Sequence, residues 1–132
     1  MIIGKLKYEE DILEGLLRVA KENEIKEGAV FLIGAVKEAV IGYYNQEEKK
    51  YSHINLPYPM EIVSGIGNIS LKDGDVFVHI HISLSDDKGD VKGGHLMVGT
   101  RVFACEYIIL PSAGLNLKRA YDNKTGLFLF KD

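Results

Sequence analysis

Three of the four histidines, His79, His81 and His95, fall within residues 76–95, whose sequence is VFVHIHISLSDDKGDVKGGH. The first half of this stretch alternates with a period of two, and successive side chains of a strand point to opposite faces of a sheet. The pattern therefore predicts a strand with one aliphatic face and one histidine face. Imidazole on such a face is a ligand that suits zinc.

The polar residues that follow this strand predict a turn, because Lys88-Gly89 supplies a residue that adopts a positive φ at low cost. A chain that folds back about Lys88 places Ser85 opposite Val91 and His81 opposite His95. Directly opposed residues have Cβ atoms about 4.5–5.5 Å apart. The sequence thus predicts a hairpin that gathers three histidines on one face.

Two interpretations of this cluster remain open. In the first, His79, His81 and His95 bind a divalent metal, most naturally Zn²⁺, and three protein ligands leave a fourth position free, as in catalytic zinc sites. In the second, two exposed histidines happen to lie near a third. Gly93-Gly94 either forms a bulge that spoils the register or aims His95 at the other two.

Other chemistry-bearing residues are weaker candidates. Glu106 shares one face of the strand expected at 102–110 with aliphatic residues, so it is a candidate general base for a metal site, a carboxylate partner to a histidine N–H, or an interface carboxylate paired with a cation of another subunit. His53 is either a fourth ligand or an exposed strand histidine, and the second is favoured. Cys105 is expected to be a buried small apolar residue, because no neighbour in sequence would activate its thiol.

The remaining patterns predict the elements that position these residues. We expect a strand at 2–6, a helix at 9–23, strands at 29–36 and 39–44 joined by a turn at Lys37-Glu38, strands at 51–56, 61–71 and 102–110, and a final hairpin of 115–121 and 127–130. This tally predicts an α+β fold with a mainly antiparallel sheet and one main helix packed on it, as a single domain over residues 1–132. Strands that are apolar on both faces predict that the second face meets another subunit.

Composition narrows the function classes. The net charge is −3 at pH 7, which opposes nonspecific binding to nucleic acid. The basic pairs Lys49-Lys50 and Lys118-Arg119 are short, and we expect them to be solvated surface. A single cysteine excludes an internal disulfide and fits a reducing compartment. No long apolar run and no signal peptide are recognisable, so we expect a cytoplasmic protein without a membrane segment.

Three segments resemble one known family. They are IGAVKEAVIGYY, EIVSGIGNISLKDG and VHIHISLSDDKGDVKGGHLMVGTRVFACEYIIL. The order H-x-H, S-L-S-D-x-x-G and G-G-H-L resembles the stand-alone prokaryotic type of the plants-and-prokaryotes conserved (PPC, also PCC) domain family, from about residue 2 to residue 110. The resemblance implies a compact α+β unit that assembles as a trimer, and a metal bound at His79, His81 and His95.

The resemblance also implies DNA binding, but not through the residues that perform it in plants. Plant members carry an Arg-Gly-Arg-Pro arm ahead of the domain, and this chain has no such motif and only three arginines. We therefore expect a trimeric binding or regulatory module with a histidine-bound zinc ion. The alternatives are a zinc enzyme of unknown substrate, with Glu106 as candidate base, and a sensor of a small ligand.

Overall fold

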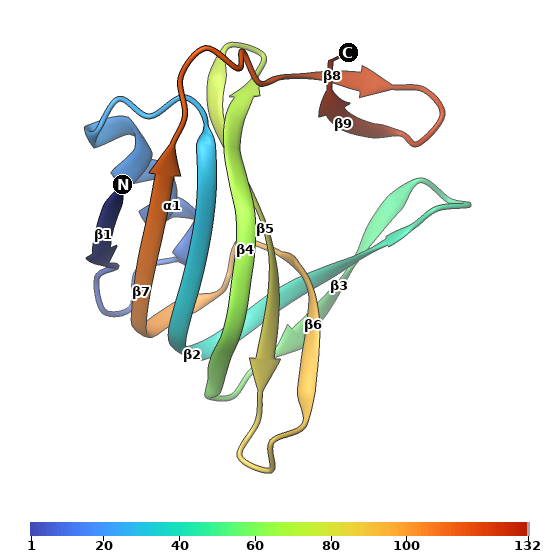
Figure 1. Ribbon diagram of the computed structural model, residues 1–132. Coiled ribbons are helices and arrows are strands. Elements are labelled where there is room, and N and C mark those ends of the chain that lie inside the picture. The colour runs from blue at the N-terminus through green and yellow to red at the C-terminus, as the bar shows by residue number, and fades with distance from the viewer. Residues whose placement is uncertain (132) are drawn as a thin grey trace.

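The computed structural model describes residues 1–131 and shows a mainly antiparallel sheet with one helix (Figure 1). The strands are β1 (Ile2–Lys5), β2 (Gly28–Asn45), β3 (Lys50–Leu56), β4 (Met60–Lys72), β5 (Asp75–Ser85), β6 (Val91–Leu96), β7 (Arg101–Pro111), β8 (Lys118–Asp122) and β9 (Leu127–Phe130), and the helix is α1 (Ile12–Glu22). The predicted α+β fold is confirmed.

The long strand β2 organises the sheet, and the turn predicted at Lys37-Glu38 is wrong. The first half of β2 lies between β4 and β7, and its second half pairs with β3 and β6. The charged pair in its middle does not reverse the chain, because β2 stays paired through it, with Glu38 opposite Arg101 of β7 and Ala39 opposite Leu56 of β3. Register shifts in the β2–β7 pairing at this point bend the strand instead.

The helix is shorter than the predicted range 9–23. It begins after Asp11, whose carboxylate accepts a hydrogen bond from the Glu14 amide at 3.1 Å and so caps the first turn. Glu9 has a φ of 65° and lies outside the helix. No helix within residues 1–131 is long and apolar enough to cross a membrane.

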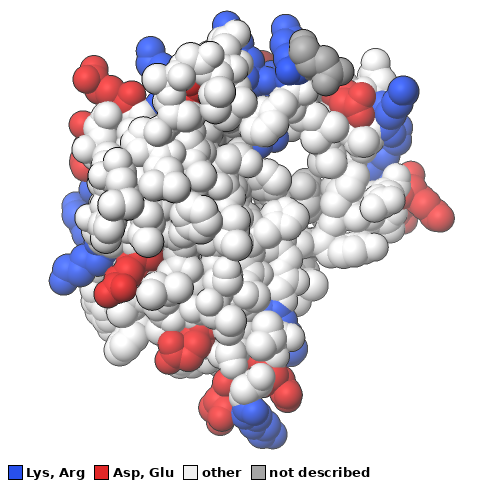
Figure 2. Space-filling view, in the orientation of Figure 1, with Lys and Arg blue, Asp and Glu red and all other residues white. Residues whose placement is uncertain are grey.

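The two faces of the sheet differ. One face packs on α1 and forms the core, with Val30, Ile69, Ile80 and Ile109 all at most 1% exposed. The opposite face is open and apolar, and we call it the open face; it carries Phe31, Ile33, Ile66, Ile108 and Leu110, each 38–56% exposed. Figure 2 shows the open face as a largely uncharged surface with most charges at its margins.

The last two strands form the predicted hairpin, which stands away from the main sheet (Figure 1). It joins the sheet through a short parallel pairing of β8 with the end of β4, where Leu71 lies opposite Lys118 and Lys72 opposite Arg119. The loop before β8 is fixed by Glu27, whose carboxylate accepts hydrogen bonds from the amides of Leu115 and Leu117 at 3.0 and 2.9 Å.

Candidate metal centre

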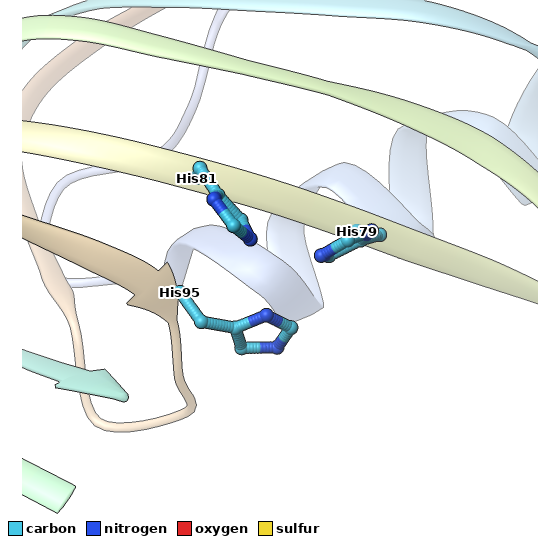
Figure 3. Close-up of side chains that lie close together, drawn as sticks. All are labelled: His79, His81 and His95. Carbon is cyan, nitrogen blue, oxygen red and sulfur yellow. The ribbon is translucent and has the colours of Figure 1, made fainter. Parts of the chain in front are cut away.

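The β5–β6 hairpin has the register predicted from the sequence. His81 lies opposite His95, and Ser85 lies opposite Val91. His79 is two residues from His81 on β5, so its side chain projects from the same face. One ligand nitrogen from each of the three histidines lies within 4.8 Å of the others, and the rings converge as Figure 3 shows.

Gly93 and Gly94 keep this hairpin regular, so of the two alternatives left open for this pair, the bulge is absent from the β5–β6 pairing. A Cβ at Gly93 would lie 2.7 Å from the carbonyl oxygen of Ile82, and one at Gly94 would lie 2.6 Å from that of Gly42. These approaches involve backbone atoms, which move only if the strands separate. The glycines therefore let β6 approach both neighbours and hold His95 at its register position.

Burial controls the protonation of two of the histidines. The pKa of His79 is lowered to about 4, first by burial and then by the nearby His95, His81 and Arg119. The pKa of His95 is also lowered to about 4, again mainly by burial, with His81 adding to the effect. Both imidazoles are therefore neutral at neutral pH, which is the form that binds a metal ion.

Two neighbours of the triad were not predicted as site residues. The Tyr51 ring lies 4.8 Å from the His95 ring between centroids, and its hydroxyl lies 3.5 Å from His95 Nδ1. On β8, the guanidinium of Arg119 donates to Asn68 Oδ1 at 2.8 Å, and Asn68 is the residue of β4 that pairs with His79. Neither position carries a local motif, because both are brought to the triad by long-range pairing.

The expectation that Lys118-Arg119 is a solvated pair is wrong for Arg119. Its guanidinium is partly buried and also donates to Ser70 Oγ at 2.8 Å and to the Phe128 carbonyl at 2.9 Å. It lies over the rings of Phe77 and Phe130, at 5.2 and 4.5 Å from their centroids. Burial lowers the pKa of Arg119, but the guanidinium stays protonated. Arg119 thus places a fixed positive charge beside the triad.

The other predicted site residues lie apart from the triad. Glu106 is exposed on β7, where it pairs with Lys5 of β1 and Ile33 of β2, and two strands separate β7 from β5. His53 is exposed on β3 and is not in the histidine cluster. Cys105 is 1% exposed, as predicted, and burial raises the pKa of its thiol to about 12.

Comparison with known proteins identifies the family of this chain. The family model of the Plants and Prokaryotes Conserved (PCC) domain matches residues 1–112. The chain belongs to this family. The PCC match covers the open face and the histidine triad but ends before the β8–β9 hairpin.

Solved structures resemble the whole chain, including the hairpin. A metal-containing protein from Archaeoglobus fulgidus is 44% identical with a TM-score of 0.94, covering 99% of this chain and 92% of that one. A plant- and prokaryote-conserved protein from Pyrococcus horikoshii is 35% identical with a TM-score of 0.94, covering 99% and 90%. A "putative DNA binding protein" from Bacteroides thetaiotaomicron is 26% identical with a TM-score of 0.89, covering 98% and 90%. No curated protein matches the chain.

Proposed function

We propose that this PCC-domain protein binds a divalent metal ion, Zn²⁺, through His79, His81 and His95. The observation that carries the proposal is the convergence of three ligand nitrogens within 4.8 Å of one another. A tetrahedral site with Zn–N bonds of about 2.0–2.1 Å requires nitrogens about 3.4 Å apart, so the three rings have to move together by up to about 1.4 Å when a metal binds. The neutral state of His79 and His95 and the metal-containing neighbour from Archaeoglobus fulgidus support the same assignment.

Elemental mass spectrometry on protein purified without a histidine tag tests this proposal. The parent is expected to hold near-stoichiometric zinc, and a His79→Ala/His81→Ala variant is expected to hold none. His53→Ala is the matched control, because His53 is exposed and lies outside the cluster. No metal in the parent after zinc is supplied, or equal zinc in the parent and the double variant, would overturn the proposal.

We further propose that the module is a homotrimer that buries the open face. One support is the set of large apolar side chains that a single chain leaves exposed on the open face, because monomeric proteins in solution rarely carry a large contiguous apolar patch. The other support is the family resemblance. Light scattering is expected to give three times the subunit mass of 14.7 kDa. Ile66→Glu on the open face is expected to give monomers, whereas Val98→Glu, on an exposed turn, is not. A monomeric parent contradicts the proposal.

DNA is a partner suggested by the Bacteroides neighbour, which is called a DNA binding protein, whereas the net charge of −3 opposes DNA binding. A titration of the protein with duplex DNA at increasing salt concentration tests whether DNA is a partner. Binding through phosphate contacts weakens steeply with salt, with a slope set by the number of contacts. Absence of binding at low salt would leave a metal-dependent module that acts without DNA.

A metal-dependent enzyme is the second candidate function. Three protein ligands leave a coordination position open to a small molecule, and a pocket lies beside the triad with His79 and His95 in its wall. Glu106 is too far along the sheet to act as base in the same chain. Substitution with Co²⁺ tests the open position: added azide is expected to change the visible spectrum of the Co²⁺ protein, and an unchanged spectrum would exclude this candidate.

A further inference from the structure

A pocket lies between the histidine triad and the β8–β9 hairpin, and no motif in the sequence announces it. Its volume is about 260 Å³. The tip of the hairpin closes onto the β2–β3 hairpin, because Tyr44 donates to the Thr125 carbonyl at 2.6 Å and Lys49 donates to the Asn123 carbonyl at 2.9 Å. Figure 2 shows an opening beside the β8–β9 hairpin at this place.

The charge of the pocket is opposite in sign to that of the whole chain. Its lining includes four cationic side chains, and no Asp or Glu among the described residues lines it. These cations are Lys49, Lys50, Lys72 and Arg119. The chain as a whole has a net charge of −3. A concave site lined by one sign of charge concentrates ligands of the opposite sign.

Two of these cations are held together and have no carboxylate partner within residues 1–131. Lys72 and Arg119 lie opposite each other in the β4–β8 pairing. Arg119 uses three of its N–H groups to bind Asn68, Ser70 and the Phe128 carbonyl, so its position is fixed. The side-chain ammonium of Lys72 makes no hydrogen bond or ion pair within residues 1–131 and lies against the Phe128 ring, so its N–H groups are available to a ligand.

Apart from the cations and the two histidines, the wall is made mainly of aromatic and aliphatic side chains. Lys72 Nζ lies 4.0 Å from the centroid of the Phe128 ring and 5.2 Å from that of Phe77. Tyr51 lines the same pocket next to His95. Pockets of this kind bind molecules with an apolar body and a small number of polar groups, because the apolar surface gives affinity and the charges fix orientation.

We infer that this pocket binds a small organic acid, whose carboxylate lies between Lys72 and Arg119 and whose apolar body lies against Phe77 and Phe128. The inference deepens the proposed metal function in one respect, since His79 and His95 also line the pocket and a bound acid lies beside the metal. Carboxylate oxygen is itself a ligand for zinc. The cations and aromatic rings are present whether or not metal is bound, so the two proposals can fail separately.

Benzoate is the probe that tests this inference, measured by calorimetry and by saturation-transfer NMR on zinc-loaded and metal-free protein. Saturable binding to the parent is expected. Lys72→Met keeps the apolar stem and removes the charge, so we expect binding about tenfold weaker. Lys72→Arg keeps the positive charge and is expected to bind benzoate as the parent does. Lys118→Met is the matched control, because Lys118 is an exposed neighbour on β8 that does not line the pocket.

Two further probes separate charge from apolar contact. Benzyl alcohol has the ring without the charge, and inorganic phosphate has the charge without the ring, so both are expected to bind more weakly than benzoate. Equal binding of benzoate and benzyl alcohol, equal binding by Lys72→Met and the parent, or no saturable binding of benzoate would overturn the inference. If zinc does not bind but benzoate does, the metal proposal alone fails; if zinc binds and benzoate does not, this inference alone fails.

Discussion

Gly67 of β4 is the position where one added methyl group should disturb the triad most directly. It pairs with Ile80 of β5, between the residues of β4 that pair with His79 and His81. A Cβ on Gly67 would lie 1.8 Å from the carbonyl oxygen of His79, whereas ordinary contacts begin at 3.4 Å. The difference of 1.6 Å (3.4 minus 1.8) can be relieved only if β4 and β5 separate behind the histidines.

The cost of Gly67→Ala follows from three effects. Overpacking costs about 1–3 kcal/mol, and each ladder hydrogen bond that is lost costs about 1 kcal/mol. Restriction of the unfolded chain by alanine offsets about 0.4–1 kcal/mol. With one ladder hydrogen bond lost, we expect a net loss of about 1–4 kcal/mol in the free energy of unfolding. For a chain of this size the melting temperature should fall by about 10 °C.

The assay combines urea denaturation with zinc titration. Gly67→Ala is expected to lower both the stability and the zinc affinity. Gly15→Ala in α1 is the matched control, because its new Cβ would meet only side-chain atoms, of Glu10 at 2.9 Å and of Leu6 at 3.1 Å, and alanine favours the helix by up to about 1 kcal/mol. It should stay within about 1 kcal/mol of the parent. A Gly67→Ala variant with parental stability and zinc affinity would refute the close approach of β4 to β5.

Three more predictions concern stability and reactivity. The pKa values of His79 and His95 are about 4 in the folded chain, against 6.5 for the free side chain. The metal-free protein should therefore keep its full stability above pH 6.5 and lose stability as the pH falls toward 4, because in this range only the unfolded state takes up protons. Urea denaturation across this range measures whether stability falls with pH as expected. Thr100→Val should cost about 1–3 kcal/mol, because it removes the buried hydroxyl that accepts from the Val40 amide at 3.0 Å, and Thr100→Ser should lose much less in the same assay. Cys105, with a thiol pKa raised to about 12, should react with a thiol reagent at pH 8 only after denaturant is added; rapid labelling of the native protein would show that the site is open.

The histidine hairpin could be predicted because its signals are local. Alternation along β5 fixes the face of His79 and His81, and a short turn with a positive φ at Gly89 fixes the register that brings in His95. No long-range information is needed for these steps. The buried state of Cys105 was also predicted from local sequence, because no neighbouring residue would activate its thiol.

The errors have long-range causes. Lys37-Glu38 has the composition of a turn, yet β2 continues because it pairs with distant segments on both sides of these residues, with β7 at Glu38 and with β3 from Ala39. Arg119 looks like surface in sequence, but the parallel pairing of β8 with β4 carries it to Asn68 and the triad. Local sequence patterns do not encode such pairings, so the wall of the pocket that the β8–β9 hairpin supplies could not be predicted from the sequence.

The position of the β8–β9 hairpin has a consequence for sorting relatives of this protein. The histidines lie inside residues 1–112, which the family model matches, whereas Arg119 and Phe128 lie after them. A comparison restricted to the family segment therefore compares metal ligands and ignores one wall of the cavity. Two members with the same triad can differ in what they hold beside it. Subgroups of the family should be drawn from alignments that continue through residue 130.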